Sequence, residues 1–427
     1  NTATKNYYMY LNVSNNTFTY TQNENTPELL LTITDASGNE ITSITGLTYK
    51  TVTDGKGASI SGFDITTKSG LITLFDNREI TATPAKTEEW NVTVTFVNYN
   101  VNQTGNAGKS FDAKLMIQQK KLGNQTLAEY VISQYTGTQG ENSIYHHNST
   151  LANGAGDNSY RYAGANPNNY VCFGSDATTC PEDNLYRIIG VFGNQVKLIK
   201  ATIAKSNLLG TDGAYSSDTA YYWSTLSSCP SSTAYNSNNG IYQLANKNTI
   251  AVGDLTGCNE WHYSDLNKTN LNTNFVNNIG SIWAKKIATT TWKVGGGSDT
   301  YLRDAVPSTA YQYEVGSSAS TTTYDAKIGL MYVSDYGFAA DQSGWTTKLG
   351  SYNSNTSKNW LYLGSDEWTI SRIEGASLPF DAFDINSGGV YYERVFLSNV
   401  ARPTFNLLSS VTYVSGSGTM NDPIVIN

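Results

Sequence analysis

Apolar and polar positions alternate with a period of two between residues 5 and 118. Short turn signals, such as Asp54-Gly55 and Ser69-Gly70, interrupt the alternation. Such alternation, broken by glycine turns at this spacing, predicts short antiparallel strands that pack as a sandwich. The expected strands are Tyr8–Val13, Leu29–Ile33, Leu47–Val52, Val92–Val97 and Phe111–Ile117.

The periodicity becomes helical shortly after residue 120. Leu127, Tyr130 and Val131 share one helical face, and Thr126 with Glu129 forms a capping-box pattern. We therefore predict two domains, an immunoglobulin-like β-sandwich over residues 1–119 and a second, α+β domain over residues 120–427. The Gly-, Asn- and Ser-rich stretch from this helix to about residue 170 is expected to be a loop.

Further elements are predicted in the second domain. The β-rich runs 185–192 and 195–200 flank Gly193-Asn194 and predict a hairpin. Apolar spacing predicts a helix from about residue 264 to 279, capped by Ser264 or Asp265. Residues 327–333 are expected to form a buried strand, and 411–414 with 424–426 a closing hairpin around a glycine-rich turn.

Composition narrows the range of functions. Charged residues make up 15% of the 427-residue chain and its formal net charge is -8, so no basic footprint for nucleic acid is present. Tyr outnumbers Phe by 30 to 13, as is common in secreted and cell-surface β proteins. No apolar run is long enough to span a membrane. We expect an extracellular, cell-surface protein that begins at Asn1 as a processed or truncated ectodomain, anchored through a segment N-terminal to it.

Four cysteines lie in the middle of the chain. Three pairings are possible, and local spacing favours Cys172 with Cys180 and Cys229 with Cys258. Disulfides fit an oxidising compartment. A metal site or free buried thiols are the alternatives, but the chain has no CxxC pair and only His262 lies near these cysteines.

Residues for catalysis are scarce. The chain has three histidines and no GxSxG elbow, HExxH helix, phosphate loop or GxGxxG fingerprint. The adjacent pair His146 and His147 could ligate a metal, although neighbouring side chains on an extended strand diverge. Asp366 and Glu367 diverge in the same way and are interpreted as solvated charges. The sequence therefore predicts no enzyme, no cofactor and no metal.

Several segments of the second domain carry a family resemblance. They are NPNNYVCFG from Asn166, CPEDNLYRIIGVFGNQVKLIK from Cys180, KIGLMYVSDYGFA from Lys327, NWLYLGSDEWTISR from Asn359, and the terminal VARPTFNL and VTYVSGSGTMNDPIVIN. Residues 122–427 resemble C-type-lectin-like domains of the formylglycine-generating-enzyme type in surface proteins of low-GC Gram-positive gut bacteria, similar to retroelement-diversified variable proteins. The resemblance implies that the ends of the domain pair in one sheet. It implies no oxidation chemistry, because no cysteine follows Cys258, and no calcium-dependent sugar binding, because EPN, QPD and WND are absent.

The resemblance also implies a displayed surface between a Trp-containing strand, here Trp368, and the Arg402-Pro403 strand. Arg402 is expected to be a scaffold residue, a partly buried ion-pair anchor. Aromatic rings on turn-rich backbone are typical of recognition surfaces. The predicted ligand-binding residues are Ile373, Glu374, Ser377, Leu378, Phe380, Asp381, Tyr391, Tyr392, Glu393, Arg394, Phe396 and Leu397. For Leu378, Phe380 and Phe396 the alternative is that they belong to the core.

These observations lead to one main hypothesis and two alternatives. The main hypothesis is a non-catalytic adhesin or receptor whose aromatic C-terminal face is a candidate for diversification by a retroelement and binds a protein or glycan on another cell or host surface. The first alternative is a structural subunit of a surface filament or pilus, and a homo-oligomer is possible. The second is a carbohydrate-active enzyme whose acid pair is not recognised.

Overall fold

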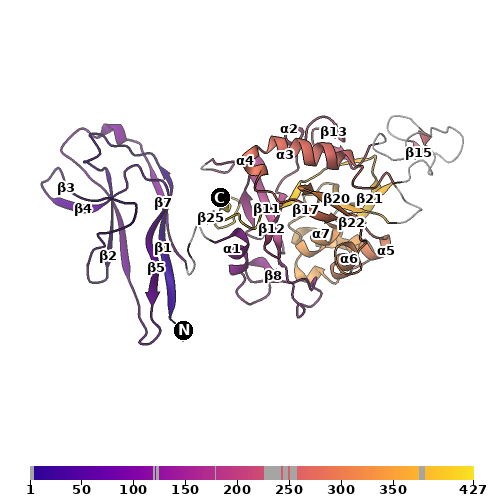
Figure 1. Cartoon of the computed structure of the whole chain (residues 1–427), viewed down its shortest axis with the longest axis horizontal. Helices are drawn as coiled ribbons and strands as arrows, with labels where there is room; N and C mark the ends of the chain where they lie inside the picture. The colour runs from indigo at the N-terminus through magenta and orange to yellow at the C-terminus, as the bar shows by residue number, and fades with distance from the viewer. Residues whose placement is uncertain are drawn as a thin grey trace. The chain divides into compact units, whose positions relative to one another are not determined.

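The computed structural model describes residues 4–118, 121, 125–177, 179–225, 242–243, 249–250, 257–374 and 380–427. It is rich in β-strands and divides into two compact units, Asn1–Gln125 and Thr126–Asn427. Figure 1 shows the strands of the first unit in indigo and purple. The second unit, which contains helices and strands, runs from purple through magenta and orange to yellow. The sequence placed the boundary between residues 119 and 120.

The first unit contains two antiparallel sheets. One sheet has the order β5-β1-β7 and the other the order β3-β4-β2-β6. All five predicted strand regions are strands, and β4 and β5 are additional. The strands are β1 (Lys5–Asn16), β2 (Leu29–Asp35), β3 (Tyr49–Thr53), β4 (Ser59–Asp64), β5 (Gly70–Ile80), β6 (Trp90–Phe96) and β7 (Phe111–Gln118), with a 3-10 turn η1 (Thr104–Asn106).

One apolar core joins these two sheets. Met9, Leu11 and Val13 alternate along β1 and pack with Leu31 and Ile33 of β2. The period of two puts these side chains on the inner faces, as the sequence pattern requires. The first unit is therefore a two-layer β structure.

The second unit is built on one larger sheet. Its strand order is β19-β24-β12-β11-β9-β8, and β10 also pairs with β11. The predicted hairpin is confirmed as β11 and β12, with Phe192 paired with Gln195 across Gly193-Asn194. The strands are β8 (Ile144–His146), β9 (Tyr160–Tyr162), β10 (Tyr170–Cys172), β11 (Leu185–Phe192), β12 (Gln195–Lys200), β19 (Ile328–Gly329) and β24 (Thr404–Asn406).

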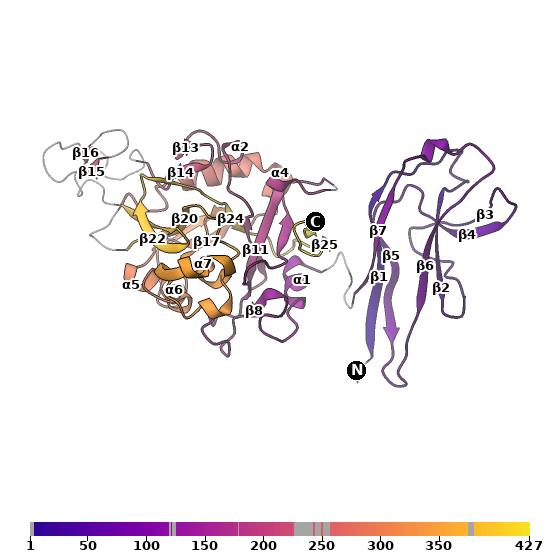
Figure 2. The same cartoon turned by 180° about the vertical axis from the view of Figure 1, so that it is seen from behind.

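Smaller sheets and short helices complete the second unit. In Figures 1 and 2, α2, α3 and α4 lie above β11 and β12, and α5, α6 and α7 lie lower. The helices are α1 (Leu127–Ser133), α2 (Ser206–Leu209), α3 (Val276–Asn278), α4 (Ser281–Ala284), α5 (Asp299–Leu302), α6 (Pro307–Glu314), α7 (Val333–Ala339), the π-helix η6 (Leu266–Phe275) and the 3-10 segments η2 (Glu141–Ser143), η3 (Glu182–Asn184), η7 (Gln342–Gly344) and η8 (Leu349–Lys358). The other strands are β13 (Tyr215–Ser217), β14 (Ala220–Tyr222), β15 (Tyr242–Gln243), β16 (Thr249–Ile250), β17 (Thr290–Lys293), β18 (Thr323–Ala326), β20 (Glu367–Arg372), β21 (Asp381–Asn386), β22 (Gly389–Arg394), β23 (Ser398–Asn399), β25 (Tyr413–Ser415) and β26 (Val425–Ile426).

Both predicted helices are present. Thr126 and Glu129 form the capping box that begins α1, as the sequence predicted. The second helix begins as η6 and continues as α3. Its start is capped by the Ser264 side chain, whose Oγ accepts a hydrogen bond from the Asn267 N–H at 3.1 Å.

Two predictions about this unit were wrong in part. The stretch expected to be a loop contains β8 and β9, whose three residues each are too few to show an alternation. The strand expected over 327–333 is reduced to β19, because α7 begins at Val333. Glu314 accepts the N–H groups of Val333 and Ser334 at 2.8 Å, and these contacts allow a helix to begin directly after the strand.

The two ends of the second unit meet. The N–H of Leu127 donates to the carbonyl of Val411 at 2.8 Å, and Tyr130 stacks on Tyr413 with centroids 3.7 Å apart. The predicted closing hairpin is confirmed as β25 and β26. Ile424 bridges to β10, which pairs with the central sheet. None of the helices in the described part of the chain combines the length and apolar character needed to cross a membrane.

Candidate functional site

The predicted ligand-binding residues lie on and beside a small antiparallel sheet with the order β20-β21-β22. Trp368 of β20 is buried, and its indole N–H donates to the carbonyl of Tyr221 at 2.8 Å. Glu367 beside it receives two hydrogen bonds from Arg402, at 2.7 and 2.8 Å. These contacts fix β20 to the rest of the unit, so the sheet is a rigid support.

The ion pair confirms one prediction and corrects another. Arg402 is an ion-pair anchor, as expected, and is fully buried. The interpretation of Asp366 and Glu367 as solvated charges holds for Asp366, which is exposed, and was wrong for Glu367. Since Glu367 faces Arg402, this adjacent pair does not form an acid and base across a cleft.

Four of the predicted display positions are buried, so the expectation that they are displayed was wrong. Phe380 is 2% exposed and Phe396 7%. The Val395 N–H donates to the Phe380 carbonyl at 2.9 Å, which closes the start of β21 on the turn after β22 and leaves both rings inside. Ile373 and Asp381 are also buried, and Asn259 donates to both of their carbonyls.

The remaining predicted positions differ in exposure. Tyr391 is 43% exposed and Leu397 42%. Glu374 is exposed as well, and its N–H donates to the Gly297 carbonyl at 3.0 Å. Ser377 and Leu378 lie outside the described residues. The half-buried positions are Tyr392, Glu393 and Arg394.

The segment that contains α5 adjoins β22, and the sequence analysis did not identify it. Arg303 follows α5 and places its guanidinium 5.7 Å from the centroid of the Tyr392 ring. Tyr301, which is 39% exposed, stacks on Tyr313 with centroids 3.7 Å apart. Figures 1 and 2 both show α5 next to β22. We call the surface formed by Tyr301, Arg303, Tyr391, Tyr392, Glu393, Arg394 and Leu397 the β22 rim.

Nothing local in the sequence predicts that α5 meets β22, because the two segments are far apart along the chain. The glycines around them were the available signal. A side chain at Gly350 would meet Arg303, and one at Gly389 would meet the Gly350 carbonyl. Close backbone approach at glycines therefore brings these segments together.

Two carboxyl groups under the rim bind protons unusually tightly. Burial, together with the charges of Asp366 and Glu393, raises the pKa of Asp384 to about 7. Burial also raises the pKa of Asp381 to about 6, against the opposing charge of Arg394. Asp384 Oδ2 accepts from Asn399 at 3.1 Å, whereas Oδ1 has no hydrogen-bond partner among the described residues. The charge of β21 therefore changes as the pH rises through about 6 to 7.

The histidines diverge, as the strand geometry predicted. His146 stacks on Tyr160 with centroids 4.2 Å apart. His147 is buried, and its Nδ1 accepts the Ala155 N–H at 3.0 Å. Burial lowers the pKa of His147. In the part of the chain that the structure describes, no three His, Cys, Asp or Glu side chains are grouped to hold a metal ion.

One predicted disulfide is present. Cys172 and Cys180 are bonded and tie β10 to the segment before η3. The second predicted pair includes Cys229, which lies outside the described residues. Its predicted partner Cys258 is fully buried.

Comparison with known proteins gives no match: no family model, no curated protein and no solved structure is significantly similar to this chain.

Proposed function

We propose that this chain is a non-catalytic, extracellular binding protein, in which an immunoglobulin-like sandwich carries a C-type-lectin-like head that binds a protein or glycan of another cell through the β22 rim. One observation carries the proposal. Arg303 lies over Tyr392, so that partly exposed aromatic and charged side chains from two distant segments form one surface. Tyr and Arg at a surface are the residue types that most often dominate binding energies.

The backbone contacts that hold β22 in place favour a role of the β22 rim in ligand recognition. β22 is the end strand of its sheet, and its side chains from Tyr391 to Arg394 are exposed or half-buried. The turn before it is held by Tyr336, whose hydroxyl donates to the Gly388 carbonyl at 2.8 Å. Exposed rings on a fixed backbone lose little entropy on binding. The Cys172–Cys180 disulfide supports an oxidising location.

Cell binding by labelled protein tests the proposal. Replacing Tyr391 and Tyr392 together with Ala should weaken binding to intact bacterial or epithelial cells by at least about thirtyfold, since one hot-spot ring alone contributes about 2 kcal/mol. Tyr215→Ala is the matched control, because Tyr215 is a half-exposed ring on β13. Equal loss of binding in the control, or unchanged binding in the double variant, would refute the role of the rim.

A structural subunit is the second candidate, and the first unit provides its support. β6 and β7 are the end strands of their sheets and expose apolar side chains: Val94, Phe96, Leu115 and Ile117. Exposed apolar end strands are typical of surfaces that another chain covers. Light scattering across a wide range of protein concentrations tests this function. If the unchanged chain assembles and the Ile117→Lys variant does not, the result would favour the structural subunit.

A further inference from the structure

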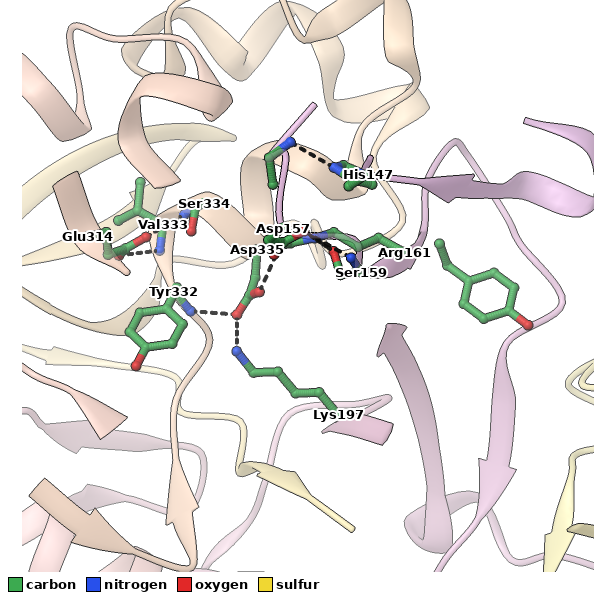
Figure 3. Close-up of polar contacts among 12 residues, drawn as sticks. His147, Asp157, Ser159, Arg161, Lys197, Glu314, Tyr332, Val333, Ser334 and Asp335 are labelled. Carbon is green, nitrogen blue, oxygen red and sulfur yellow. Dashed lines mark hydrogen bonds and ion pairs between the residues drawn. The ribbon is translucent and has the colours of Figure 1, made fainter. Parts of the chain in front are cut away.

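A separate cavity lies in the second unit, where β9, β12 and β17 meet α6 and α7. Its volume is about 170 Å³. The floor carries Lys197 and Asp335, and one wall carries Asp157 and Arg161. Figure 3 shows these four side chains converging. Partly or fully buried rings complete the lining: Phe192, Trp292, Tyr311 and Tyr332.

Lys197 has bonding capacity that the protein does not use. Its ammonium group is hydrogen-bonded and ion-paired to Asp335. Among the described residues, Asp335 is the only hydrogen-bond acceptor for its three N–H groups. The nitrogen lies 4.5 Å from the Tyr332 centroid and 5.4 Å from that of Trp292. These rings stabilise the charge but take no conventional hydrogen bond from it.

Arg161 is similarly incomplete. Its Nε donates to Ser159 Oγ at 2.8 Å and Nη2 to Asp157 at 2.6 Å. Nη1 lies 3.7 Å from Asp335 Oδ1, which is too far for a hydrogen bond. The guanidinium otherwise rests on the rings of Phe192, Tyr311 and Phe338, with centroids 4.7, 5.2 and 4.9 Å from its central carbon. Nη1 is therefore a positively charged donor that has no hydrogen-bond acceptor among the described residues.

The carboxylates, in contrast, already have partners. Asp335 accepts the Tyr332 N–H at 3.0 Å in addition to its contact with Lys197. Asp157 accepts from Arg161 and from Ser159. Lys293 also lines the cavity, so the lining holds three cations, Arg161, Lys197 and Lys293, and two carboxylates. The N–H groups without acceptors therefore belong to the cations Lys197 and Arg161. A ligand that complements them is an anion.

The size and walls limit what that anion can be. An apolar cavity of about 150 Å³ accommodates benzene, so this cavity can hold one six-membered ring or a smaller molecule. Phe192 and Tyr311 are half-buried and offer ring surface beside the charges. We propose that this cavity binds a small organic carboxylate, with its carboxylate group on Lys197 Nζ and Arg161 Nη1 and its body against the aromatic walls.

The electrostatics agree with this assignment. Burial lowers the pKa of Lys197, and the charge of Asp335 opposes that shift. A second carboxylate beside the nitrogen would further stabilise its charged form. The site is independent of the β22 rim, because no rim residue lines the cavity.

Calorimetric titration of the full chain with benzoate, with glucuronate and with the neutral amide benzamide tests the proposal. Binding of either acid, with no binding of benzamide, is expected. Benzoate alone would indicate a free acid as the natural ligand, and glucuronate alone an acidic sugar. Failure of both acids, or equal affinity for benzamide, would overturn the proposal.

Two variants locate the binding. Lys197→Met should weaken it at least tenfold, and circular dichroism must show that the variant folds. Val315→Trp keeps every charge and should block the mouth with a similar loss, because Val315 lines the cavity at the end of α6. Tyr391→Ala should leave acid binding unchanged, which separates this site from the rim. Unchanged affinity in Val315→Trp, or in a folded Lys197→Met variant, would place the ligand elsewhere.

Discussion

Replacing Asp384 with Asn tests the electrostatics beneath the β22 rim. The carboxyl is buried and its pKa is raised to about 7, first by burial and then by the charges of Asp366 and Glu393. It therefore holds its proton more tightly in the folded chain than in the unfolded chain. The stability this gives is present at low pH and is lost as the pH rises through about 7.

The magnitude follows from the shift. Between the ordinary value of 3.8 and about 7 there are about three pKa units, which correspond to about 4 kcal/mol in total. Between pH 5 and pH 8 the unfolded carboxyl is already ionised, so about 2.5 kcal/mol of this is lost within that window. The amide introduced by Asp384→Asn cannot ionise, and its oxygen can still accept from Asn399.

Urea unfolding of the chain and of Asp384→Asn at pH 5 and pH 8 gives the comparison. The variant should gain about 2.5 kcal/mol relative to the unchanged chain on going from pH 5 to pH 8. Asp176→Asn is the matched control, because Asp176 is exposed and distant in sequence. Asp366→Asn should move the pH dependence to lower pH by removing one repelling charge. Parallel curves for the chain and Asp384→Asn would refute the reasoning.

Three further predictions concern the scaffold. Arg402→Met should cost about 3–5 kcal/mol in urea unfolding, because it leaves Glu367 buried without its cation, and adding Glu367→Leu should recover most of the loss; a loss below about 1 kcal/mol would contradict the fully buried pair. Replacing Cys172 and Cys180 with Ser should cost about 2–3 kcal/mol for so short a loop, and reductant should then lower the melting temperature less than it does in the unchanged chain. Fragments 1–125 and 126–427 should each unfold cooperatively in calorimetry, since each has its own core; a second fragment that fails to fold alone would refute this.

The sequence predicts elements well where local chemistry alone determines them. The β11–β12 hairpin has alternation on both sides of a Gly-Asn turn, and α1 has a complete capping box. Both signals act within a few residues, so no distant contact is needed to interpret them. The strands β8 and β9 have no such local signal. They form because β9 pairs with β11 and β8 pairs with β9.

The helix from residue 266 shows where local reasoning ends. The apolar spacing predicted a helix here, and Leu266, Leu271 and Phe275 are buried in it, but the spacing did not predict its π geometry. Asn270 is fully buried in it and donates to the carbonyls of Leu209 and Asp212 at 2.8 and 3.0 Å. From the sequence alone, a polar side chain on a helix is expected to face solvent. Here the asparagine supplies hydrogen bonds to backbone carbonyls of a loop that is distant in sequence, a contact that only the tertiary structure reveals.

The same limit explains the errors at the candidate site. Phe380 precedes β21 and Phe396 follows β22, and whether a ring at the end of a strand faces inward depends on tertiary contacts, such as the hydrogen bond from the Val395 N–H to the Phe380 carbonyl. The sequence located the correct segment, bounded by Trp368 and Arg402, but could not identify which rings face inward. Phe380 and Phe396 form core, whereas Tyr391 is exposed. The missing contribution of Arg303 has the same cause, since it comes from a segment that meets β22 only in the folded chain.

In the β20-β21-β22 sheet, the contacts that fix the sheet to the rest of the unit are separate from the exposed strand β22. β20 is fixed by the Trp368 hydrogen bond to Tyr221 and by the Arg402–Glu367 pair, and β21 lies between β20 and β22. The exposed side chains of β22 lie outside these contacts, so their replacement removes little buried apolar area. Substitutions at Tyr391 and Leu397 should therefore change binding far more than stability, whereas substitutions at Trp368 should do the reverse. A binding surface that can vary without loss of the fold requires this separation.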